Sequence, residues 1–268
     1  MAKTIGDTSA GFVLHSYPYL ETSLIVEMFT RSHGRVVAVA KGAKRPTSAM
    51  KSRLNPFQGL LLTWFGKSDL KTLKTVEHAE IYPQLSGAAL MSAFYMNELL
   101  LKLAQREDAH EALFDAYEDA ILTLVSNCAH TEVLVSIATA LRKFEMSLLS
   151  ELGYALQLTH EADTHDLIDA EERYVYVMER GPVCLRNVVR EARARAGPRA
   201  DEAEVRYQSL PGDGLQLSGK TLLDLAAGDF SDPQTQVQAK LLMRRAINQL
   251  LGDKPLHTRQ LIRDLKDI

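Results

Sequence analysis

The sequence predicts an α+β protein in which a small N-terminal β-barrel is followed by a mainly α-helical domain. Short runs rich in Val, Ile, Leu and Phe fill residues 1–82 between turn signals, which is the pattern of β-strands. After Pro83 the apolar residues recur at the three- and four-residue spacing of helices. With 268 residues and 46% hydrophobic content, the chain can form two domains with buried cores. We therefore expect domains at residues 1–82 and 83–268.

Five strands are expected in the first domain, in the runs AGFVLHSY, SLIVEMFT, GRVVAVAKG, QGLLLTWFG and KTLKTVEHAEI. Turn signals separate them at Pro18, at His33-Gly34 and at Gly66–Asp69. Five short strands are too few for a sandwich and fit a small closed or partly open barrel. We predict an OB-fold, with an SH3-like barrel as the alternative. The single Trp, Trp64, either fills the barrel core or forms a stacking platform on the barrel surface.

Helices are expected through most of the second domain. Helical spacing is clear in GAALMSAFYMNELLLKLAQ, HEALFDAYEDAILTLVS and TEVLVSIATALRKFEMSLLSELGY. It returns at Thr221, from Asp232 to Leu251 and from Thr258. The stretch from 159 to 215 is a less regular insert. It contains RYVYVM as a possible strand and REARARAGPRADEAE as a charged segment that we expect to be exposed or mobile.

Charge is distributed unevenly along the chain. The formal net charge is −3, yet residues 1–80 contain eleven Lys and Arg against six Asp and Glu. The stretch KGAKRPTSAMKSRL, residues 41–54, holds five cations and no acid. Its Gly, Pro, Thr and Ser disfavour a helix, so we expect these cations on a loop between strands. Clustered cations attract polyanions, although a solvated surface with an excess of Lys would give the same pattern.

Cysteine content and hydropathy bear on the compartment. Cys128 and Cys184 stand 56 positions apart, which favours two reduced thiols over a disulfide framework. No apolar run approaches the roughly 18 residues that span a bilayer, and the N-terminus lacks the apolar centre of a signal peptide. We therefore expect no membrane association and a cytoplasmic location.

The stretch THEADTHDL contains a cluster of potential metal ligands. His160 and His165 are five residues apart and would not share one face of a helix, so the geometry of a zinc-protease helix is absent. Two Cys residues in the whole chain also exclude a four-Cys zinc site. We expect a solvated polar loop here, and no metal or cofactor.

The stretch GLQLSGKT, residues 214–221, matches the phosphate-loop pattern G-x-x-x-x-G-K-[ST]. A phosphate loop also needs a buried strand before its first Gly and a later strand that ends in a magnesium-binding Asp. The preceding residues are polar and broken by Pro211, and only helical segments follow. The simpler interpretation is a helix capped by Ser218 and ended by Gly228. A nucleotidase centred on Lys220 is the alternative.

Several stretches, taken in order, resemble the RecO family of bacterial recombination mediators. The first run, from Gly11 to Leu62, contains GFVLHSYP, ETSLIVEMFT, GRVVAVAKGA and NPFQGLLL. It is followed by YMNELLLKL, LRKFEMSLLSELGY and LGDKPLHTRQLIRDL. The resemblance implies an OB-fold barrel, a helical domain and no enzymatic turnover. It also implies binding of single- and double-stranded DNA at the nucleoid, and annealing of complementary strands. With RecR, family members load RecA onto strands coated with single-stranded-DNA-binding protein.

The resemblance also implies which residues bind these partners. DNA contacts would come from the basic loop and its surroundings, at Arg35, Lys41, Lys44, Arg45, Lys51 and Arg53, with Lys71 and Lys74 as additions. The acidic tail of the single-stranded-DNA-binding protein would dock at Arg142 and Lys143, which are otherwise two solvent-facing charges on an amphipathic helix. A protein-only adaptor, in which the basic loop is merely solvated, is a further alternative.

Two departures from the family pattern are visible. Some members carry a four-Cys zinc module, of which this chain keeps only Cys184 in ERGPVC, so it is similar to the zinc-free branch. His257-Thr258 stands where Lys-Ser is commoner, which lowers the charge of the C-terminal segment at neutral pH.

Overall fold

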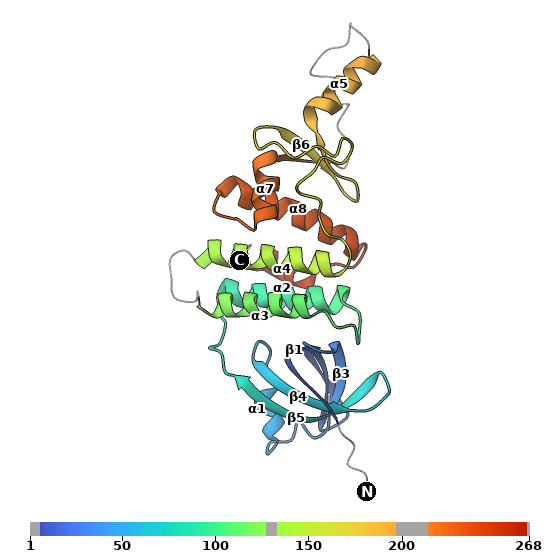
Figure 1. The fold of residues 1–268 in the computed structure, drawn as a ribbon. Coiled ribbons are helices and arrows are strands. Elements are labelled where there is room, and N and C mark those ends of the chain that lie inside the picture. Colours follow the sequence, from blue (N-terminus) through green and yellow to red (C-terminus); the bar gives the residue numbers. More distant parts are fainter. Residues whose placement is uncertain (1–5, 127–132, 197–213, 267–268) are drawn as a thin grey trace. The chain divides into compact units, whose positions relative to one another are not determined.

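The computed structural model describes residues 6–126, 133–196 and 214–266 (Figure 1). Contacts within the chain divide it into two compact units. The first unit is Met1–Ser147 together with Asp253–Ile268, and the second is Leu148–Gly252. The expected boundary between residues 82 and 83 lies inside the first unit, where the barrel gives way to helices, and it stays a prediction about domains.

The first unit begins with a closed barrel of five strands. They are β1 (Asp7–Tyr19), β2 (Ser23–Thr30), β3 (Gly34–Ala40), β4 (Gly59–Phe65) and β5 (Leu70–Glu80). Their order around the barrel is β1-β2-β3-β5-β4, and β4 pairs back with β1. All neighbours are antiparallel except β3 and β5. This is the arrangement of an OB-fold, as the strand pattern predicted.

The interior of the barrel is filled by one alternating set of side chains. Val13, Val26, Met28 and Leu62 belong to this cluster, as does Trp64, whose relative exposure is 1%. Of the two interpretations that the sequence allowed for Trp64, the core position is confirmed. A side chain so deeply buried cannot stack on a ligand, so the surface platform at this residue is wrong.

The loop after β3 contains an element that the sequence analysis did not expect. Residues Ala49–Arg53 form the short helix α1, and Ser48 occupies its N-cap position. The Gly and Pro residues that argued against a helix lie before this segment, and AMKSR itself contains no helix breaker. The prediction of a wholly irregular basic loop is therefore wrong for these five residues.

Helices complete the first unit. They are α2 (Gly87–Leu103), α3 (Glu111–Ser126), α4 (Val133–Glu151), which crosses into the second unit after Ser147, and the C-terminal α9 (His257–Lys266). Aromatic rings join the barrel to α3, because Phe12 lies 5.1 Å from Tyr117 between ring centroids. Tyr117 also donates to Asn97 on α2, and Asn97 in turn donates to the carbonyl of Leu14 on β1. A chain of two buried hydrogen bonds therefore connects the barrel to α2 and α3, next to the aromatic contact.

The segment after α2 is joined to the start of β3 by its backbone. The N–H of Glu107 donates to the carbonyl of Arg35 at 2.9 Å. Gly34 makes this approach possible, because its φ is +61° and a Cβ there would stand 1.8 Å from the carbonyl oxygen of Asp108. The turn signal His33-Gly34 therefore marks a hairpin against which the backbone of Glu107 and Asp108, just after α2, packs closely.

The second unit combines a small sheet with helices. The sheet has the order β7-β6-β8, from β6 (Arg173–Val177), β7 (Gly181–Cys184) and β8 (Leu215–Ser218). The helices are α5 (Leu185–Ala196), α7 (Gly219–Ala227) and α8 (Pro233–Leu251). The possible strand in RYVYVM is confirmed. The charged segment expected to be exposed or mobile begins within α5, and its residues from 197 onward lie outside the described residues, as does Cys128.

Two general expectations can be compared with the described part of the chain. Cys184 is a free, buried thiol. Among the described residues, none of the helices combines the length and the apolar character that a membrane crossing requires.

Candidate nucleic-acid interface

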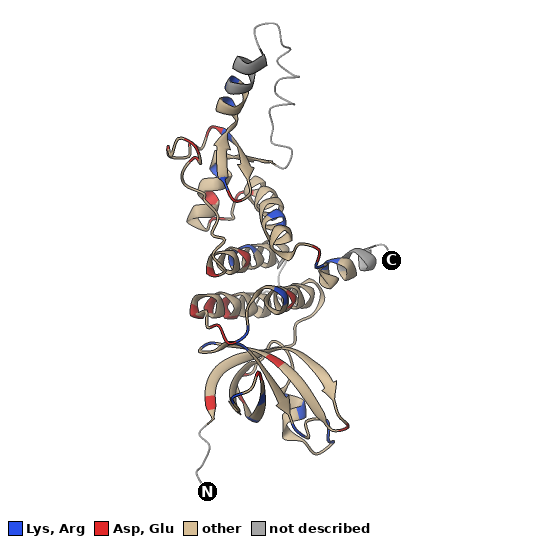
Figure 2. Ribbon diagram, turned by 90° about the vertical axis from the view of Figure 1, so that its right-hand side faces the viewer, with Lys and Arg blue, Asp and Glu red and all other residues tan. Residues whose placement is uncertain are grey.

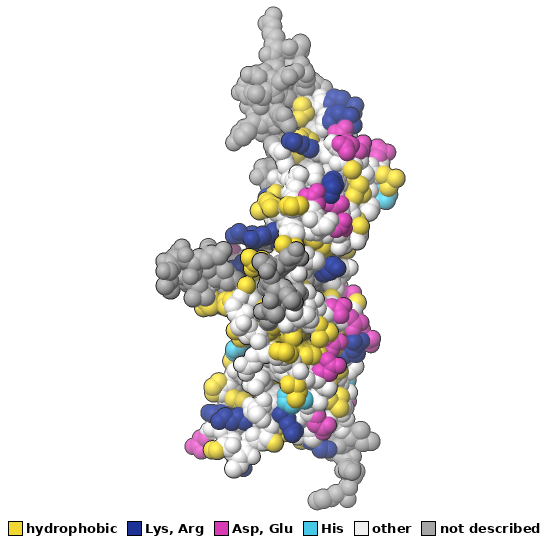
Figure 3. Space-filling model, turned by 90° about the vertical axis from the view of Figure 1, so that its left-hand side faces the viewer, with side chains coloured by type: hydrophobic (Ala, Val, Ile, Leu, Met, Phe, Trp, Pro, Cys, Tyr) yellow, Lys and Arg dark blue, Asp and Glu magenta, His cyan; other side chains and the backbone are white. Residues whose placement is uncertain are grey.

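The structure divides the eight cations predicted to contact DNA into two groups. Five have exposed side chains, namely Lys41, Lys44, Arg45, Lys51 and Lys74. Within the described ranges, no carboxylate forms an ion pair with any of these five. Lys and Arg are blue in Figure 2, and Figure 3 shows dark blue side chains on the surface of the barrel, in the lower part of the view. We call these five residues the basic surface.

The basic surface is held in place by backbone contacts at the start of the loop. Ala43 is fully buried in the barrel core, so it fixes the loop between two exposed residues of the surface. The N–H of Lys44 donates to the carbonyl of Thr22 at 2.8 Å, which ties the loop to the turn between β1 and β2. The N–H of Arg45 closes a turn on Gly42 at 3.1 Å. The first three cations therefore project from an anchored backbone.

The far end of the loop returns to β5. Arg53 follows Lys51 on α1 and donates from Nη1 to the carbonyl of Val76 on β5, at 2.9 Å. The parallel register of β3 and β5 pairs Val39 with Thr72, so Lys41 leaves β3 at the level where β5 reaches Lys74. Both ends of the loop thus lie beside the same strand, β5, which also carries Lys74.

Arg35 was expected to contact DNA, but the structure places its guanidinium inside the protein. Its side chain is only 11% exposed, its Nε lies 3.5 Å from a carboxylate oxygen of Glu27, and its Nη1 donates to the carbonyls of Leu101 and Ala104 at 2.6 and 2.8 Å. Those carbonyls are at the C-terminal end of α2, where helix acceptors lack partners. Burial lowers the pKa of Arg35, and Glu27 opposes this shift. The guanidinium supports the fold and is not available to phosphates.

Lys71 was also expected to contact DNA but is buried, and Arg53 is only partly accessible. The Lys71 side chain is 9% exposed, and its Nζ lies 2.6 Å from Oε1 of Glu107. Arg53 is half-buried and shares its guanidinium with the backbone of β5. The sequence could not reveal the pairing of Lys71, because Glu107 follows α2 and only the fold brings it to the barrel. We therefore leave Arg35, Lys71 and Arg53 out of the basic surface.

Comparison with known families identifies the chain along almost its whole length. Residues 2–82 match the family model described as "Recombination protein O N terminal", and residues 84–260 match "Recombination protein O C terminal". The chain belongs to the RecO family. RecO is a family of DNA repair proteins and not of catalytic ones, so this protein is not an enzyme. The resemblance described from the sequence motifs is confirmed.

Individual relatives support the same assignment. The chain is 44% identical to the DNA repair protein RecO of Nitrosospira multiformis, over 98% of this chain and 97% of that protein. It is 45% identical to the protein of the same name from Aromatoleum aromaticum, over the same shares. With RecO of Polynucleobacter asymbioticus it shares 45% identity over 96% of each chain. The chain thus spans both RecO regions.

In this RecO chain the phosphate-loop match cannot hold a phosphate. The N–H groups of Gly219 and Lys220 donate to the carbonyls of Glu172 and Ala170, at 2.8 and 3.1 Å. A Cβ on Gly219 would stand 1.8 Å from the carbonyl oxygen of Asp169, so backbone fills the space in front of the loop. The Nζ of Lys220 is paired with Asp224 and Asp232. The nucleotidase alternative is therefore wrong, and Ser218 caps α7 as the simpler interpretation predicted.

The polar stretch THEADTHDL is more ordered than a solvated loop. His160 and His165 are exposed as expected, but Glu161 is buried and accepts the N–H of Cys184 at 2.9 Å and the side-chain amide of Asn187 at 3.3 Å. Arg180 also donates from Nη2 to both carboxylate oxygens of Asp163. These contacts fix the stretch to the hairpin of β6 and β7. The described residues contain no cluster of three or more potential metal ligands.

The two residues assigned to a partner peptide differ in their environment. Arg142 is 11% exposed, and its Nε lies 2.8 Å from the carboxylate of Glu145, which is buried. Burial raises the pKa of Glu145, and Arg142 opposes that shift. Lys143 is exposed and lines a groove of about 510 Å³ between α3 and α4. The groove also contains Ala116, Asp119, Ala120, Leu122 and Ala140.

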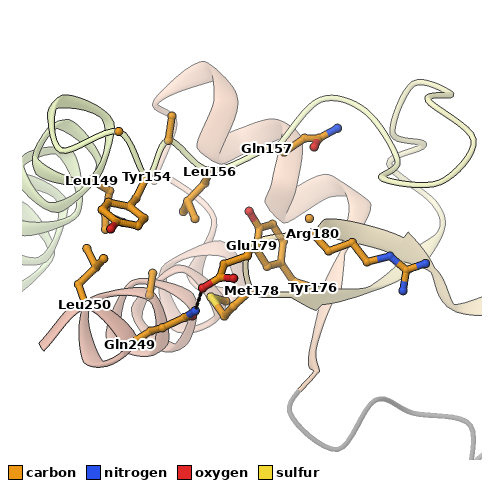
Figure 4. Close-up of a pocket in the computed structure, with 14 residues that line it drawn as sticks. Leu149, Tyr154, Leu156, Gln157, Tyr176, Met178, Glu179, Arg180, Gln249 and Leu250 are labelled. Atoms are coloured by element: carbon orange, nitrogen blue, oxygen red, sulfur yellow. Dashed lines mark hydrogen bonds between the residues drawn. The ribbon is translucent and has the colours of Figure 1, made fainter. Parts of the chain in front are cut away.

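The second unit contains a separate hollow of about 460 Å³ (Figure 4). Leu149, Tyr154 and Leu250 gather on one side of it, and Tyr176 and Met178 lie on the hairpin side. Gln249 and Glu179 are hydrogen-bonded to each other at its edge. The charged groups of this hollow already have partners, since Arg180 pairs with Asp163. It is therefore a poor site for nucleic-acid phosphates.

Proposed function

We propose that this protein is a DNA repair and recombination mediator that binds single- and double-stranded DNA and anneals complementary strands. With RecR it helps to load RecA onto strands coated with single-stranded-DNA-binding protein. The observation that supports the proposal is the basic surface, whose five exposed cations on the barrel of a RecO chain have no acidic partner among the residues that the structure describes. Binding to chromosomal DNA would place the protein in the cytoplasm, in association with the nucleoid.

The chemistry of the basic surface suits strand annealing. Each phosphate that a Lys or Arg neutralises releases a condensed counterion, which favours binding of any sequence. Two complementary strands repel each other through their phosphates, and cations that neutralise both backbones reduce this repulsion. Contacts to phosphates position a strand without reading its bases. The surface can therefore hold either strand of a pair while the bases find their partners.

For the single-stranded-DNA-binding protein, we propose that its acidic tail docks in the groove between α3 and α4. A terminal carboxylate needs a cation at the edge of the groove, and an apolar side chain needs burial. Lys143 supplies the cation, and Ala116, Ala120 and Ala140 supply apolar surface. Arg142 does not join it in this role, because its guanidinium is paired with Glu145.

A triple variant tests the DNA-binding proposal. Replacing Lys44, Arg45 and Lys51 by Ala should weaken binding to single- and double-stranded oligonucleotides of several sequences alike, by about 10- to 100-fold at low salt, because phosphate contacts are lost. Mobility-shift titrations measure the effect.

A matched control removes the same charge elsewhere. Lys240, Arg244 and Lys254 are exposed residues outside the barrel, and changing all three to Ala should leave DNA affinity nearly unchanged. If the barrel variant bound DNA as tightly as the wild type, the site would lie elsewhere. If the wild type bound no oligonucleotide at all, the protein-only adaptor would be the better account.

A further inference from the structure

Three ring side chains form a row on the outer face of β1. His15, Tyr17 and Tyr19 are spaced two residues apart, so they point to the same side of the strand. An irregularity in the pairing with β2, between Val13 and His15, changes the alternation so that these rings face outward while Val13 faces the core. Tyr17 is 45% exposed and Tyr19 is 37% exposed. We call these three residues the ring row.

The ring row has a charged neighbour at its first residue and apolar neighbours further along. His15 is paired with Glu27 on β2, whose carboxylate contacts Arg35 and Arg106. Tyr17 is paired with Ile25 on β2, and Ile25 is paired with Val39 on β3. The rings of His15 and Tyr17 are already in contact, with centroids 4.3 Å apart. Positions two residues apart along a strand advance by about 7 Å, so a flat partner has room between Tyr17 and Tyr19, although not between His15 and Tyr17. The row therefore presents aromatic surface that the fold does not itself cover.

The ring row ends where the basic surface begins. Tyr19 is paired with Ser23 across the turn that joins β1 and β2. The carbonyl of Thr22, in that same turn, accepts the N–H of Lys44. The exposed residues of the turn include one acid, Glu21, and the basic loop next to it contains none between Lys41 and Leu54. A backbone hydrogen bond at this turn thus links the strand of the ring row to the basic loop.

We propose that His15, Tyr17 and Tyr19 form a stacking face for the unpaired bases of single-stranded DNA, while the phosphates of the same strand lie on the basic surface. This inference rests on the proposed DNA-binding function and adds the site at which the protein distinguishes single strands from duplex DNA. Every base has a flat face, so stacking tolerates any sequence. The bases of a duplex are already stacked on one another and cannot reach the rings. The ring row therefore adds affinity for single strands alone.

The test combines a protein variant with a modified DNA strand. Changing Tyr17 and Tyr19 together to Ala should weaken binding of a single-stranded oligonucleotide by about 100-fold, or about tenfold for each ring. Binding of a duplex of the same length should change less than about twofold, since its bases do not use the rings. Changing both residues to Phe keeps the ring faces and should retain the single-strand affinity. Thermal unfolding followed by circular dichroism checks that each variant is folded.

A strand of the same length without bases supplies the second arm. The wild type should bind this abasic strand at least as weakly as the Ala variant binds the normal strand, and the Ala variant should lose much less on it than the wild type does, because only His15 is left to stack. The inference is overturned if the wild type binds normal and abasic strands equally. It is also overturned if the folded Ala variant keeps wild-type single-strand affinity. Failure of the underlying function is distinct, because the wild type would then bind neither single strands nor duplex.

Discussion

Arg35 and Lys41 lie six residues apart, one within β3 and one just after its end, and they illustrate how burial decides the role of a cation. Arg35 faces Glu27 and the carbonyl end of α2, so its donors are used inside the protein. Lys41 is exposed, and the structure gives it no acidic partner in the described part of the chain. A cation can bind a phosphate only when its charge is not already neutralised. The same residue type therefore stabilises the fold at one position and is available to DNA at the other.

At the residue scale, replacing Arg35 by Ala should lower the free energy of unfolding by about 2–4 kcal/mol. The change leaves the buried carboxylate of Glu27 with Arg106 alone and frees the carbonyls at the end of α2. Urea unfolding measures the loss. Below the unfolding transition, the folded variant should bind DNA as the wild type does.

Lys41→Ala is the matched variant for this experiment. It should change the free energy of unfolding by less than about 0.5 kcal/mol, because the side chain is exposed. It should nevertheless weaken DNA binding. An Arg35→Ala protein of unchanged stability but reduced DNA affinity would contradict the roles that we assign to these two residues.

At the scale of elements, α9 depends on a carboxylate from another helix. Glu98 on α2 accepts the N–H groups of His257 and Thr258, at 2.8 and 2.9 Å, and the hydroxyl of Thr258. It therefore satisfies donors at the start of α9 in place of a local N-cap side chain. Burial alone would raise the pKa of Glu98, but the hydrogen bonds from Thr258 and His257 and the contact with Lys102 lower it.

The lowered pKa fixes the sign of a pH effect. A carboxylate whose pKa falls on folding stabilises the folded state fully above its unfolded pKa of about 4.3, and this contribution is lost as pH falls through the folded value. Glu98→Gln should therefore increase hydrogen exchange of the α9 amides at pH 7. It should also make the free energy of unfolding depend less on pH below about pH 5.

Glu111→Gln serves as the control for that variant, because Glu111 is an exposed residue in the first turn of α3. It should leave the exchange of α9 amides unchanged. Equal protection of α9 in the Glu98→Gln protein and the wild type would show that the helix does not need this cap.

At the scale of the whole molecule, the sequence predicted the elements well because their periods are strong. The five strands of the barrel are short runs rich in Val, Ile, Leu and Phe between turn signals, and α2, α3 and α8 repeat apolar residues at helical spacing, so pattern alone located them. The small sheet of β6, β7 and β8 was only partly foreseen, because its strands are four or five residues long and one comes from a distant part of the chain.

The candidate site was predicted less completely than the fold. The sequence identified the basic loop, because five cations without an acid stand out in fourteen residues. It could not separate Lys71 from Lys74, since Glu107 meets only the first of them in the folded chain. It also directed attention to Trp64 as the aromatic residue, whereas the pairing irregularity in β1 exposes Tyr17 and Tyr19 instead. Long-range contacts and register, which composition does not encode, decide both points.

The most direct test of the central claim is the salt dependence of single-strand binding by the wild type and by the variant in which Lys44, Arg45 and Lys51 are Ala. A plot of log affinity against log salt concentration should be steep for the wild type, because phosphate contacts release counterions. The triple variant should have a slope shallower by about 2, since each lost contact to a single strand removes about 0.7. Parallel plots for the two proteins would contradict the claim that these cations hold the DNA backbone.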